Sequence, residues 1–464
     1  MDQVKEKHQR LSWRERFSYA SLDFSGQLIF NVISAYLLYF FTDVAGIPVA
    51  TAGVILLVAR VFDGIDAPIW GSLIDITHSR WGKARPYFLW MATPFAVMGV
   101  LTFWAPQIPM HQRIIYCAIT YIITGISYTG INTPLTTVLP LLTPDPQERL
   151  TLNSIRLAGS NLGVLLTNVL TLPLVALLGG GNDVIGFRWT MVIFGTLFWV
   201  LTIIAFMNIK ERVKPAQEKV SVKAGAKAIK GNWPWIIIVL SNLIFWVALT
   251  IRSSTIVYYL TYNYGDKGLV PLVNGISFVQ IIAVLLIPLF SRKFSQRNIW
   301  ITGLVLGILG QSVIWIGGHS LTIIIIGWII GNLGSGIAVS LPFALLGSAV
   351  DYGEWKTGIN AAGLLTAIGS SFCIKIGSGI GGALPAWIMG MFGYVANHQQ
   401  TAHGLFGISL AFNGMTILMF ALAIVPLIFY GKYERMQGDI TAKLQVVHDK
   451  VAADKAAAQA DSEG

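Results

Sequence analysis

Residues 55–70 read Ile-Leu-Leu-Val-Ala-Arg60-Val-Phe-Asp63-Gly-Ile-Asp66-Ala-Pro-Ile-Trp70, which places three charges inside a long apolar stretch. A charge at the centre of a bilayer-spanning helix costs about 2.5–3.5 kcal/mol on insertion scales. Such residues are retained where they face a partner charge, a water-filled cavity or a substrate path. Other apolar stretches carry further charges: Asp23, Arg156, Arg252 and Lys375. We therefore expect the functional site at these charges.

The composition is that of a polytopic helical membrane protein. Of the 464 residues, 54% are hydrophobic and only 12% are charged, about half the charged share of soluble domains. Stretches of about 20 apolar residues, the length that a bilayer core requires, occur twelve times. The expected spans are 20–42, 48–76, 86–105, 112–142, 150–178, 188–209, 233–262, 270–290, 298–317, 321–349, 361–392 and 405–431. We expect an all-α membrane protein.

The one long polar interruption, 210–232, separates six expected spans from six others. It predicts an N-terminal six-helix bundle (1–209), a cytoplasmic middle loop (210–232), a C-terminal six-helix bundle (233–431) and a cytoplasmic tail (432–464). Two six-helix halves are the layout of many secondary transporters, whose binding site lies near the midplane between the halves.

The positive charges follow an alternating pattern. Most of the 32 Lys and Arg residues lie in 1–16, 80–85, 210–230, 292–297 and the tail, whereas the opposite loops hold only Arg113, Arg188 and Lys267. This asymmetry predicts a multi-pass protein of the cell membrane with both termini in the cytoplasm. A nucleic-acid partner is not expected, because its binding face would gather charge on one folded surface. We also expect no cofactor, no metal site and no obligate protein partner.

The spacing in the second span allows two interpretations. Arg60 and Asp63 are three residues apart and can pair along one helix face, and so are Asp63 and Asp66. In the first interpretation Arg60 and Asp63 form a structural ion pair while Asp66 bonds to a neighbouring helix. In the second, which the pattern favours, the carboxylates form a cation or proton site that faces a central cavity. Two carboxylates one turn apart suit Na⁺, whereas a single desolvated carboxylate more readily takes a proton.

Charges from three other expected spans are candidates to line the same cavity. Asp23, Arg156 and Lys375 can bind vicinal hydroxyl groups, so a small sugar or glycoside is the expected ligand. Aromatic faces that stack on a sugar ring occur nearby, at Tyr19, Phe30, Tyr36, Tyr128, Tyr258 and Tyr259. Arg252 either completes this site or locks the two halves together.

Loops on the basic side suggest a cytoplasmic gate. Asp145-Pro-Gln-Glu148-Arg149 after the fourth span is echoed by Asp351-Tyr-Gly-Glu354-Trp-Lys356 after the tenth. We interpret four acidic and basic residues as gate residues: Asp75, Arg80, Asp351 and Glu354. The run Gly377-Ser-Gly-Ile-Gly-Gly382 lies inside an expected span, so it favours close helix packing over dinucleotide binding.

Three motifs together resemble the glycoside–pentoside–hexuronide:cation symporter family, the melibiose-carrier-like branch of the major facilitator superfamily. They are Leu57-Val-Ala-Arg-Val-Phe-Asp-Gly-Ile-Asp-Ala-Pro68, Arg80-Trp-Gly-Lys83 and Val350-Asp-Tyr-Gly-Glu-Trp-Lys356; Tyr39-Phe-Phe-Thr-Asp43 agrees with them. The resemblance implies the major facilitator fold and symport of a glycoside with Na⁺, Li⁺ or H⁺ by alternating access. It maps sugar contacts onto Asp23, Tyr128, Arg156, Ser371 and Lys375, and the cation site onto Asp63, Asp66 and Thr129.

The sequence departs from the melibiose carrier at three places. Ala67 stands where that carrier has a carboxylate before the proline, and Asp66 precedes it, a slip that rotates a side chain by about 100°. This favours H⁺ coupling through Asp63. Asn132 replaces a sugar-binding carboxylate, with Thr136 in place of a nearby tryptophan, and Leu22 replaces a basic residue. We therefore expect Asn132 to contact the sugar, and a xyloside, another β-glycoside or a glucuronide in preference to an α-galactoside.

Two other classes of function stay open. A lysophospholipid:cation symporter shares this fold and would need an apolar cavity, which the polar set does not favour. A transporter-like sugar sensor would need a signalling module, which the tail does not offer. An enzyme is not expected, because the sequence holds no assembled catalytic set.

Overall fold

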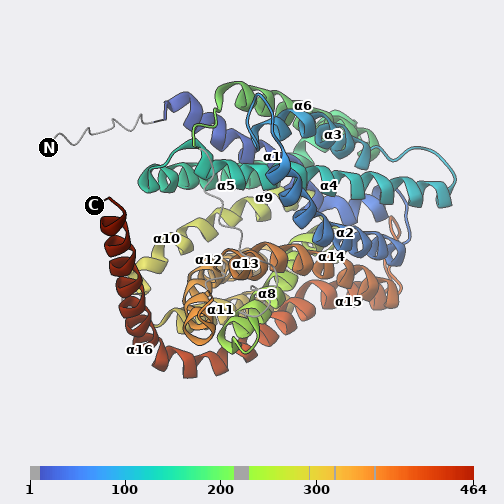
Figure 1. Cartoon of the computed structure of the whole chain (residues 1–464). Coiled ribbons are helices and arrows are strands. Elements are labelled where there is room, and N and C mark those ends of the chain that lie inside the picture. Colours follow the sequence, from blue (N-terminus) through green and yellow to red (C-terminus); the bar gives the residue numbers. More distant parts are fainter. Residues whose placement is uncertain (1–10, 214–228, 292, 318–319, 360–361, 464) are drawn as a thin grey trace. The chain divides into compact units, whose positions relative to one another are not determined.

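The computed structural model describes residues 11–213, 229–291, 293–317, 320–359 and 362–463, and its regular elements over these ranges are helices (Figure 1). The helices before residue 214 are α1 (Trp13–Tyr39), α2 (Val49–Ile76), α3 (Arg85–Thr102), α4 (Met110–Leu142), α5 (Pro146–Gly179) and α6 (Asp183–Asn208). The later ones are α8 (Trp233–Tyr258), α9 (Val270–Gly275), α10 (Val279–Phe290), α11 (Gln296–Gly317), α12 (Leu321–Thr357), α13 (Ala362–Ala367), α14 (Cys373–Met391), α15 (Ala402–Ser409) and α16 (Met415–Glu463).

Short non-α turns continue several of these helices. Four are π-helical: η1 (Phe40–Val44), η2 (Tyr259–Tyr264), η5 (Ile368–Phe372) and η6 (Leu410–Gly414). Two are 3₁₀-helical: η3 (Lys267–Leu269) and η4 (Ile276–Phe278). Because single π-turns inside helices often mark functional positions, η1 and η5 are of interest here.

The expected spans fall on helical segments of the structure. Ten of the described helices are long and apolar enough to cross a membrane. α2 and α3 do not reach that standard, since α2 carries Arg60, Asp63 and Asp66 in its middle and α3 begins at Arg85. The chain is therefore a helical membrane protein, and the count of twelve crossings stays a prediction.

The first of two compact units comprises Met1–Gln217, Thr250–Phe278 and Ser378–Met415. In it α1 packs on α5 and α6, α3 on α4 and α6, α2 on α4, and α9 on α5. Glycines make the crossing of α1 and α5 close. A Cβ on Gly163 would lie 2.5 Å from the Phe24 carbonyl oxygen, and one on Gly159 would lie 2.9 Å from that of Ala20. This contact sets Asp23 on α1 against Arg156 on α5.

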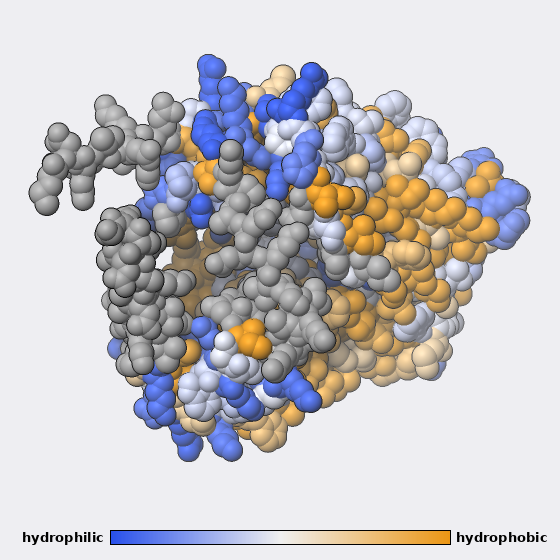
Figure 2. All heavy atoms as spheres, viewed as in Figure 1, coloured by the Kyte–Doolittle hydropathy of each residue, from blue (hydrophilic) through white to orange (hydrophobic). Residues whose placement is uncertain are grey.

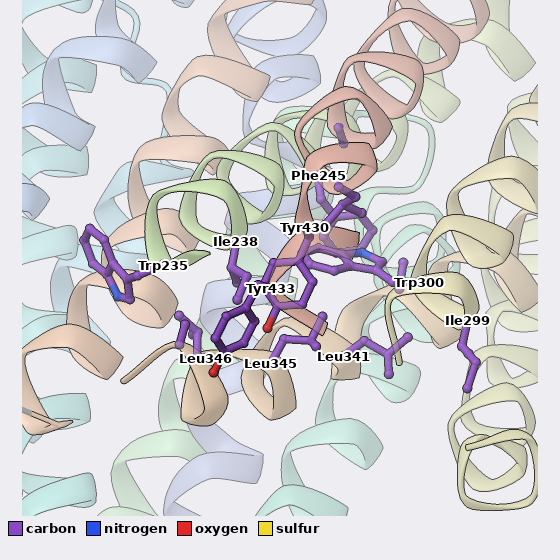
Figure 3. Close-up of a cluster of buried hydrophobic side chains, with 14 of the residues drawn as sticks. Trp235, Ile238, Phe245, Ile299, Trp300, Leu341, Leu345, Leu346, Tyr430 and Tyr433 are labelled. Carbon is purple, nitrogen blue, oxygen red and sulfur yellow. The ribbon is translucent and has the colours of Figure 1, made fainter. Parts of the chain in front are cut away.

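The second unit comprises Glu218–Leu249, Val279–Gly377 and Thr416–Gly464. Its α11 and α12 also meet at glycines, since a Cβ on Gly327 would lie 2.6 Å from the Gly310 carbonyl oxygen. Bulky side chains from α8, α11, α12 and α16 form its hydrophobic core, including Trp235, Trp300, Leu345, Tyr430 and Tyr433 (Figure 3).

The surface carries many large apolar side chains. Leu177, Ile316 and Met391 are 78%, 88% and 81% exposed, and hydrophobic residues cover much of the face seen in Figure 2. In a soluble protein such a surface would cause aggregation, whereas in a membrane protein it contacts lipid.

The predicted domain boundaries are not tested by this division into units, because each unit contains segments from both sides of 210–232. Residues 214–228 of the predicted middle loop lie outside the described residues. In the predicted tail, the backbone continues the helix α16 to Glu463.

Candidate substrate and coupling site

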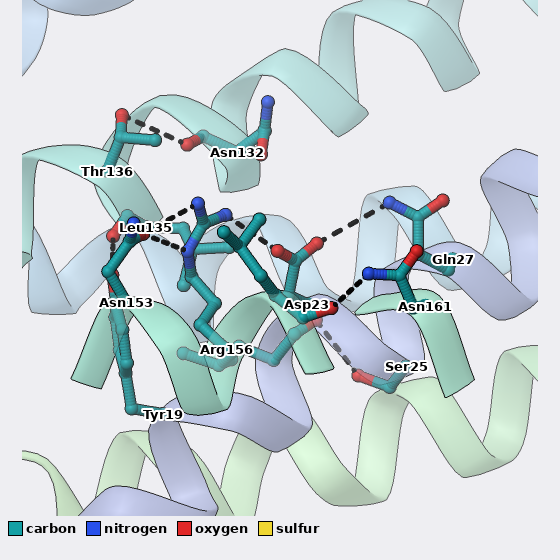
Figure 4. A network of polar contacts seen from close by, with 12 residues as sticks. Tyr19, Asp23, Ser25, Gln27, Asn132, Leu135, Thr136, Asn153, Arg156 and Asn161 are labelled. Atoms are coloured by element: carbon teal, nitrogen blue, oxygen red, sulfur yellow. Dashed lines mark hydrogen bonds and ion pairs between the residues drawn. The ribbon is translucent and has the colours of Figure 1, made fainter. Parts of the chain in front are cut away.

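An ion pair between α1 and α5 forms the centre of the candidate site (Figure 4). Arg156 Nη1 lies 2.6 Å from Asp23 Oδ2, and the two side chains are 16% and 8% exposed. The rest of the guanidinium group donates to Asn153 Oδ1, from Nε at 3.2 Å and from Nη2 at 3.0 Å. Gln27 Nε2 lies 3.5 Å from Asp23 Oδ1. The pair is thus buried, held by amide side chains and rich in groups that bind hydroxyls.

An aromatic pair lies next to these charges. The rings of Phe30 on α1 and Tyr128 on α4 stack with centroids 4.3 Å apart and an interplanar angle of 12°. The Arg60 guanidinium carbon lies 5.8 Å from the Phe30 centroid. Phe30 also lies on α1 two helical turns after Asp23. The stacked pair therefore connects α1, which carries a predicted sugar residue, with the Arg60 guanidinium group of α2.

The three charges of α2 are all buried in the structure. Arg60 Nη1 lies 3.1 Å from Asp63 Oδ2, with side chains 9% and 8% exposed, and Asp66 is 7% exposed. The ion pair of the first interpretation is thus present. It is also compatible with the second, because a carboxylate can hold an arginine in one state of a carrier and a cation in another. The coupling role of Asp63 and Asp66 stays a prediction.

The packing of α2 on α4 depends on a glycine. A Cβ on Gly125 would overlap Asp63 Oδ1, so this residue admits the carboxylate to the surface of α4. Thr129, one turn later, is 3% exposed and donates to the Gly125 carbonyl oxygen at 3.2 Å. The same face of α4 therefore presents Gly125, Tyr128 and Thr129 toward α1 and α2.

The other amino acids predicted to contact the sugar lie on α4, η5 and α14. Asn132 lies on α4 one turn after Tyr128 and is half-buried. Ser371 is exposed in η5, and Lys375 is half-buried near the start of α14. Both belong to the second unit, so a cavity shared with Asp23 and Arg156 stays a prediction. Arg252 is buried in α8, 3% exposed.

The predicted gate residues lie at the end of α2, in the turn between α2 and α3, and in the last turns of α12. The Arg80 guanidinium carbon lies 4.5 Å from the Trp81 ring centroid. The Asp75 side chain lies outside the described residues. Asp351 and Glu354 are half-buried in the last turns of α12, and Lys356 Nζ donates to the Gly231 carbonyl oxygen at 3.0 Å. Pairing of these acids with basic loop residues stays a prediction.

The contacts of Glu148 and Glu211, at the basic ends of the helices, were not predicted from the sequence. Glu148 pairs with Arg16 at 2.8 Å; its place in the repeated Asp-x-x-Glu motif was the available signal. Glu211 accepts hydrogen bonds from the backbone N–H groups that open α3, at 2.9, 2.9 and 2.8 Å. A carboxylate there also complements the positive end of the helix dipole. Nothing in the sequence near Glu211 indicated this role.

Comparison with known proteins places the chain in a family. A sequence model of the family described as MFS/sugar transport protein matches residues 18–432. An isoprimeverose transporter of Lactiplantibacillus pentosus is 41% identical over 442 residues, covering 94% of this chain and 92% of the relative. A glucuronide carrier protein homolog of Escherichia coli K12 is 27% identical over 441 residues, covering 94% and 96%. The inner membrane symporter YicJ of the same organism is 30% identical over 427 residues, covering 91% and 90%.

Solved structures agree on the fold. The nucleoside transporter NupG superposes with a TM-score of 0.65 at 14% identity, covering 90% of this chain and 98% of that one. A bacterial homolog of the human lysosomal transporter Spinster, in an inward-facing and unoccupied conformation, gives 0.65 at 13% identity, covering 93% and 96%. The predicted resemblance is confirmed: the chain belongs to the glycoside–pentoside–hexuronide:cation symporter family of the major facilitator superfamily.

Proposed function

We propose that the protein, a cation-coupled glycoside symporter by family, imports a xylose-containing or other glycoside by alternating access, with H⁺ as the coupling ion. The observation that carries this proposal is the buried Asp23–Arg156 ion pair beside the stacked Phe30 and Tyr128. Charged groups held in place by amide side chains are poised to exchange hydrogen bonds with vicinal hydroxyls, and such charge-assisted bonds are about twice as strong as neutral ones.

The chemistry of the pair suits a neutral, polyhydroxylated ligand. Asp23 and Arg156 are buried and neutralise each other's charge, so they do not require a charged ligand. A sugar can bridge the two side chains while its ring stacks on an aromatic face. Tyr128 supplies that face, and Asn132 one turn later supplies an amide for a further hydroxyl. A lipid ligand fits this set poorly, and the sugar names of the relatives do not favour the lysophospholipid alternative.

The arrangement around Asp63 supports H⁺ over Na⁺. Arg60 holds one carboxylate oxygen at 3.1 Å, and its charge opposes a metal cation at the same group. Na⁺ requires several oxygens, whereas a proton requires one. Opening of the Arg60–Asp63 pair during the cycle would free Asp63 to take up a proton from water.

The names of two relatives support two candidate substrate classes. One relative is named for isoprimeverose, a xylose-containing disaccharide, and another for glucuronides. We favour the xyloside, because identity to the first relative is higher and because the departures from the melibiose carrier at Leu22 and Asn132 weaken galactoside recognition.

The proposed topology is twelve spans in two six-helix bundles with both termini in the cytoplasm. It rests on the Lys and Arg asymmetry and on the ten apolar helices together with α2 and α3. The fold and the relatives are those of transporters, so we propose transport without catalysis.

Purified protein in liposomes tests this proposal. Radiolabelled isoprimeverose, methyl xylosides, a glucuronide and melibiose are offered under an inward H⁺ gradient or an inward Na⁺ gradient, at zero membrane potential. We expect accumulation of isoprimeverose with the H⁺ gradient and none with Na⁺ alone. Accumulation with Na⁺ alone would reject proton coupling, and failure of every glycoside to enter would reject the proposed substrate class.

A further inference from the structure

A further buried carboxylate, directly after the first helix, lies outside the site described above. Asp43 in η1 is 7% exposed. The Tyr394 hydroxyl lies 2.8 Å and 2.7 Å from its two carboxylate oxygens, and the Tyr262 hydroxyl donates to Oδ1. The Thr42 hydroxyl lies 2.6 Å from Oδ2. Three hydroxyl groups thus hold the Asp43 carboxyl group in place.

The donors come from distant parts of the chain. Tyr262 lies in η2, directly after α8, and Tyr394 lies in the segment between α14 and α15. Asn397 joins them, because its side-chain amide donates to the Asp43 carbonyl oxygen and its backbone N–H donates to the Tyr262 hydroxyl at 3.0 Å. We name Asp43, Tyr262, Tyr394 and Asn397 the outer latch. All four belong to the first unit, so their contacts form one compact cluster.

Neighbouring contacts join the same segments. The Thr42 and Tyr258 hydroxyls are 2.7 Å apart. Lys267 in η3 pairs with Asp183 at the start of α6, and its ammonium nitrogen lies 4.8 Å from the Tyr39 ring centroid. Helix ends from before residue 210 are thus tied to helix ends from after residue 232, at the end of the helices remote from the basic loops.

Tyr394 is suited to be a permanent donor. Burial above all, and then the neighbouring Tyr258 and Asp43, raise the pKa of Tyr394 well above its ordinary range. Its hydroxyl therefore keeps its proton at physiological pH and donates to Asp43.

We propose that Asp43 is a gating residue, and that the outer latch holds the carrier shut on its extracellular side. This inference rests on the proposed alternating-access symport. Opening to the outside requires the ends of α1 and α6 to separate from η2, η3 and the segment that follows α14. The hydrogen bonds of Tyr262 and Tyr394 to Asp43 must then break together, because one carboxylate accepts both. The latch thus has two states, intact and broken.

Weakening the outer latch should change the KM for external sugar in a direction that a loss of folding stability does not. Removal of one hydroxyl raises the population of the outward-open state, and apparent affinity rises with the fraction of competent protein. Tyr394→Phe should therefore lower the KM for external sugar and also lower the maximal rate, because reclosure becomes slower. A variant that merely destabilised the fold would leave KM unchanged or raise it.

The rate at which an introduced thiol reacts reports how often the extracellular side opens, and it can be measured without sugar. Ser254 is 3% exposed on α8, one turn before Tyr258, and its hydroxyl bonds only within its own helix in the contacts described. In Ser254→Cys, we expect a membrane-impermeant maleimide added to intact cells to react slowly. Adding Tyr394→Phe, Tyr262→Phe or Asp43→Asn should speed this reaction about tenfold, equal to about 1.4 kcal/mol. The parent protein gives the background from the buried Cys117 and Cys373.

Tyr433→Phe is the matched control. It likewise deletes a tyrosine hydroxyl that donates a hydrogen bond, but the acceptor is the Ser348 backbone carbonyl in the second unit. Its labelling rate should equal that of Ser254→Cys alone. Unchanged labelling in all three latch variants, or an equal rise in Tyr433→Phe, would overturn the gating role. If labelling rises but no glycoside is transported, the gate stands and the proposed substrate class fails; unchanged labelling with normal uptake rejects the gate alone.

Discussion

Among single residues, several charged side chains stay buried because each has a partner of opposite charge. Asp23 is compensated by Arg156, and Asp63 by Arg60. Removing one partner of a buried ion pair strands the other charge, which costs about 3–5 kcal/mol. A carrier keeps such pairs when they serve a further purpose, here the exchange of bonds with a sugar and with a coupling ion.

Arg156→Ala should abolish sugar binding. It removes the guanidinium group and leaves Asp23 uncompensated, and a loss of about 3 kcal/mol corresponds to more than a hundredfold in affinity. Titration calorimetry with isoprimeverose measures this. The control is Arg16→Ala, which breaks the Arg16–Glu148 pair at the helix ends and should leave sugar affinity unchanged. Equal affinity in Arg156→Ala and the wild type would exclude Arg156 from the site.

Asp63→Asn should uncouple transport while sparing sugar binding. The amide keeps the shape of the side chain but cannot be protonated in this pH range, so accumulation should fall to a ratio of about one. Sugar-for-sugar exchange across the membrane should persist, because it needs no net movement of the coupling ion. Measurements of uptake and of counterflow in the same vesicles distinguish the loss of accumulation from the loss of sugar exchange. Retained accumulation against a gradient would reject Asp63 as the coupling carboxylate.

At the scale of helices, glycines decide how closely the charged faces approach. Gly159 and Gly163 bring α5 onto the backbone of α1, and Gly125 lets Asp63 reach α4. A side chain at any of these positions would move a helix, and with it a member of the site.

Gly125→Ala should therefore impair transport, although the substitution adds only one methyl group. The new Cβ would overlap Asp63 Oδ1, so the carboxylate or α4 must shift. We expect at least a tenfold fall in coupled uptake with protein levels retained. Gly71→Ala on α2 is the control, because nothing lies within 4 Å of its added Cβ; alanine there should be neutral or stabilise by up to about 1 kcal/mol. Equal uptake by the two variants would contradict the inference that Gly125 makes room for Asp63 beside α4.

Glu211→Ala should lower stability without altering sugar affinity. The side chain accepts three backbone hydrogen bonds at the start of α3, and loss of a helix cap costs about 0.5–2 kcal/mol. Thermal unfolding in detergent, followed by tryptophan fluorescence, should show a lower midpoint. A midpoint equal to that of the wild type would show that the cap contributes nothing.

At the scale of the whole molecule, the sequence was sufficient for the helices and for part of the site. Hydrophobic length located the helical segments. The three-residue spacing of Arg60 and Asp63 allowed the ion pair that the structure shows, although the pattern favoured a cation or proton site. Both are local properties of the chain. The outer latch could not be predicted in this way. Asp43 meets Tyr262 and Tyr394 only after folding, and tyrosines near span ends are ordinarily interfacial anchors.

The predicted topology places the α2–α3 and α3–α4 loops on opposite sides of the membrane. In single-cysteine tests on intact cells, Gln107→Cys should react with an impermeant maleimide, whereas His78→Cys should react only after permeabilisation. Both residues are exposed in the structure. Labelling of both positions from the outside would contradict the assigned topology.

The most direct measurement follows proton movement during sugar entry. Isoprimeverose is added to lightly buffered vesicles that contain the protein, and external pH is recorded. The wild type should alkalinise the medium in proportion to sugar uptake, and Asp63→Asn should give no pH change while still exchanging sugar. Sugar accumulation without proton movement, or full proton movement in Asp63→Asn, would contradict the claim that these buried charges couple a glycoside to H⁺.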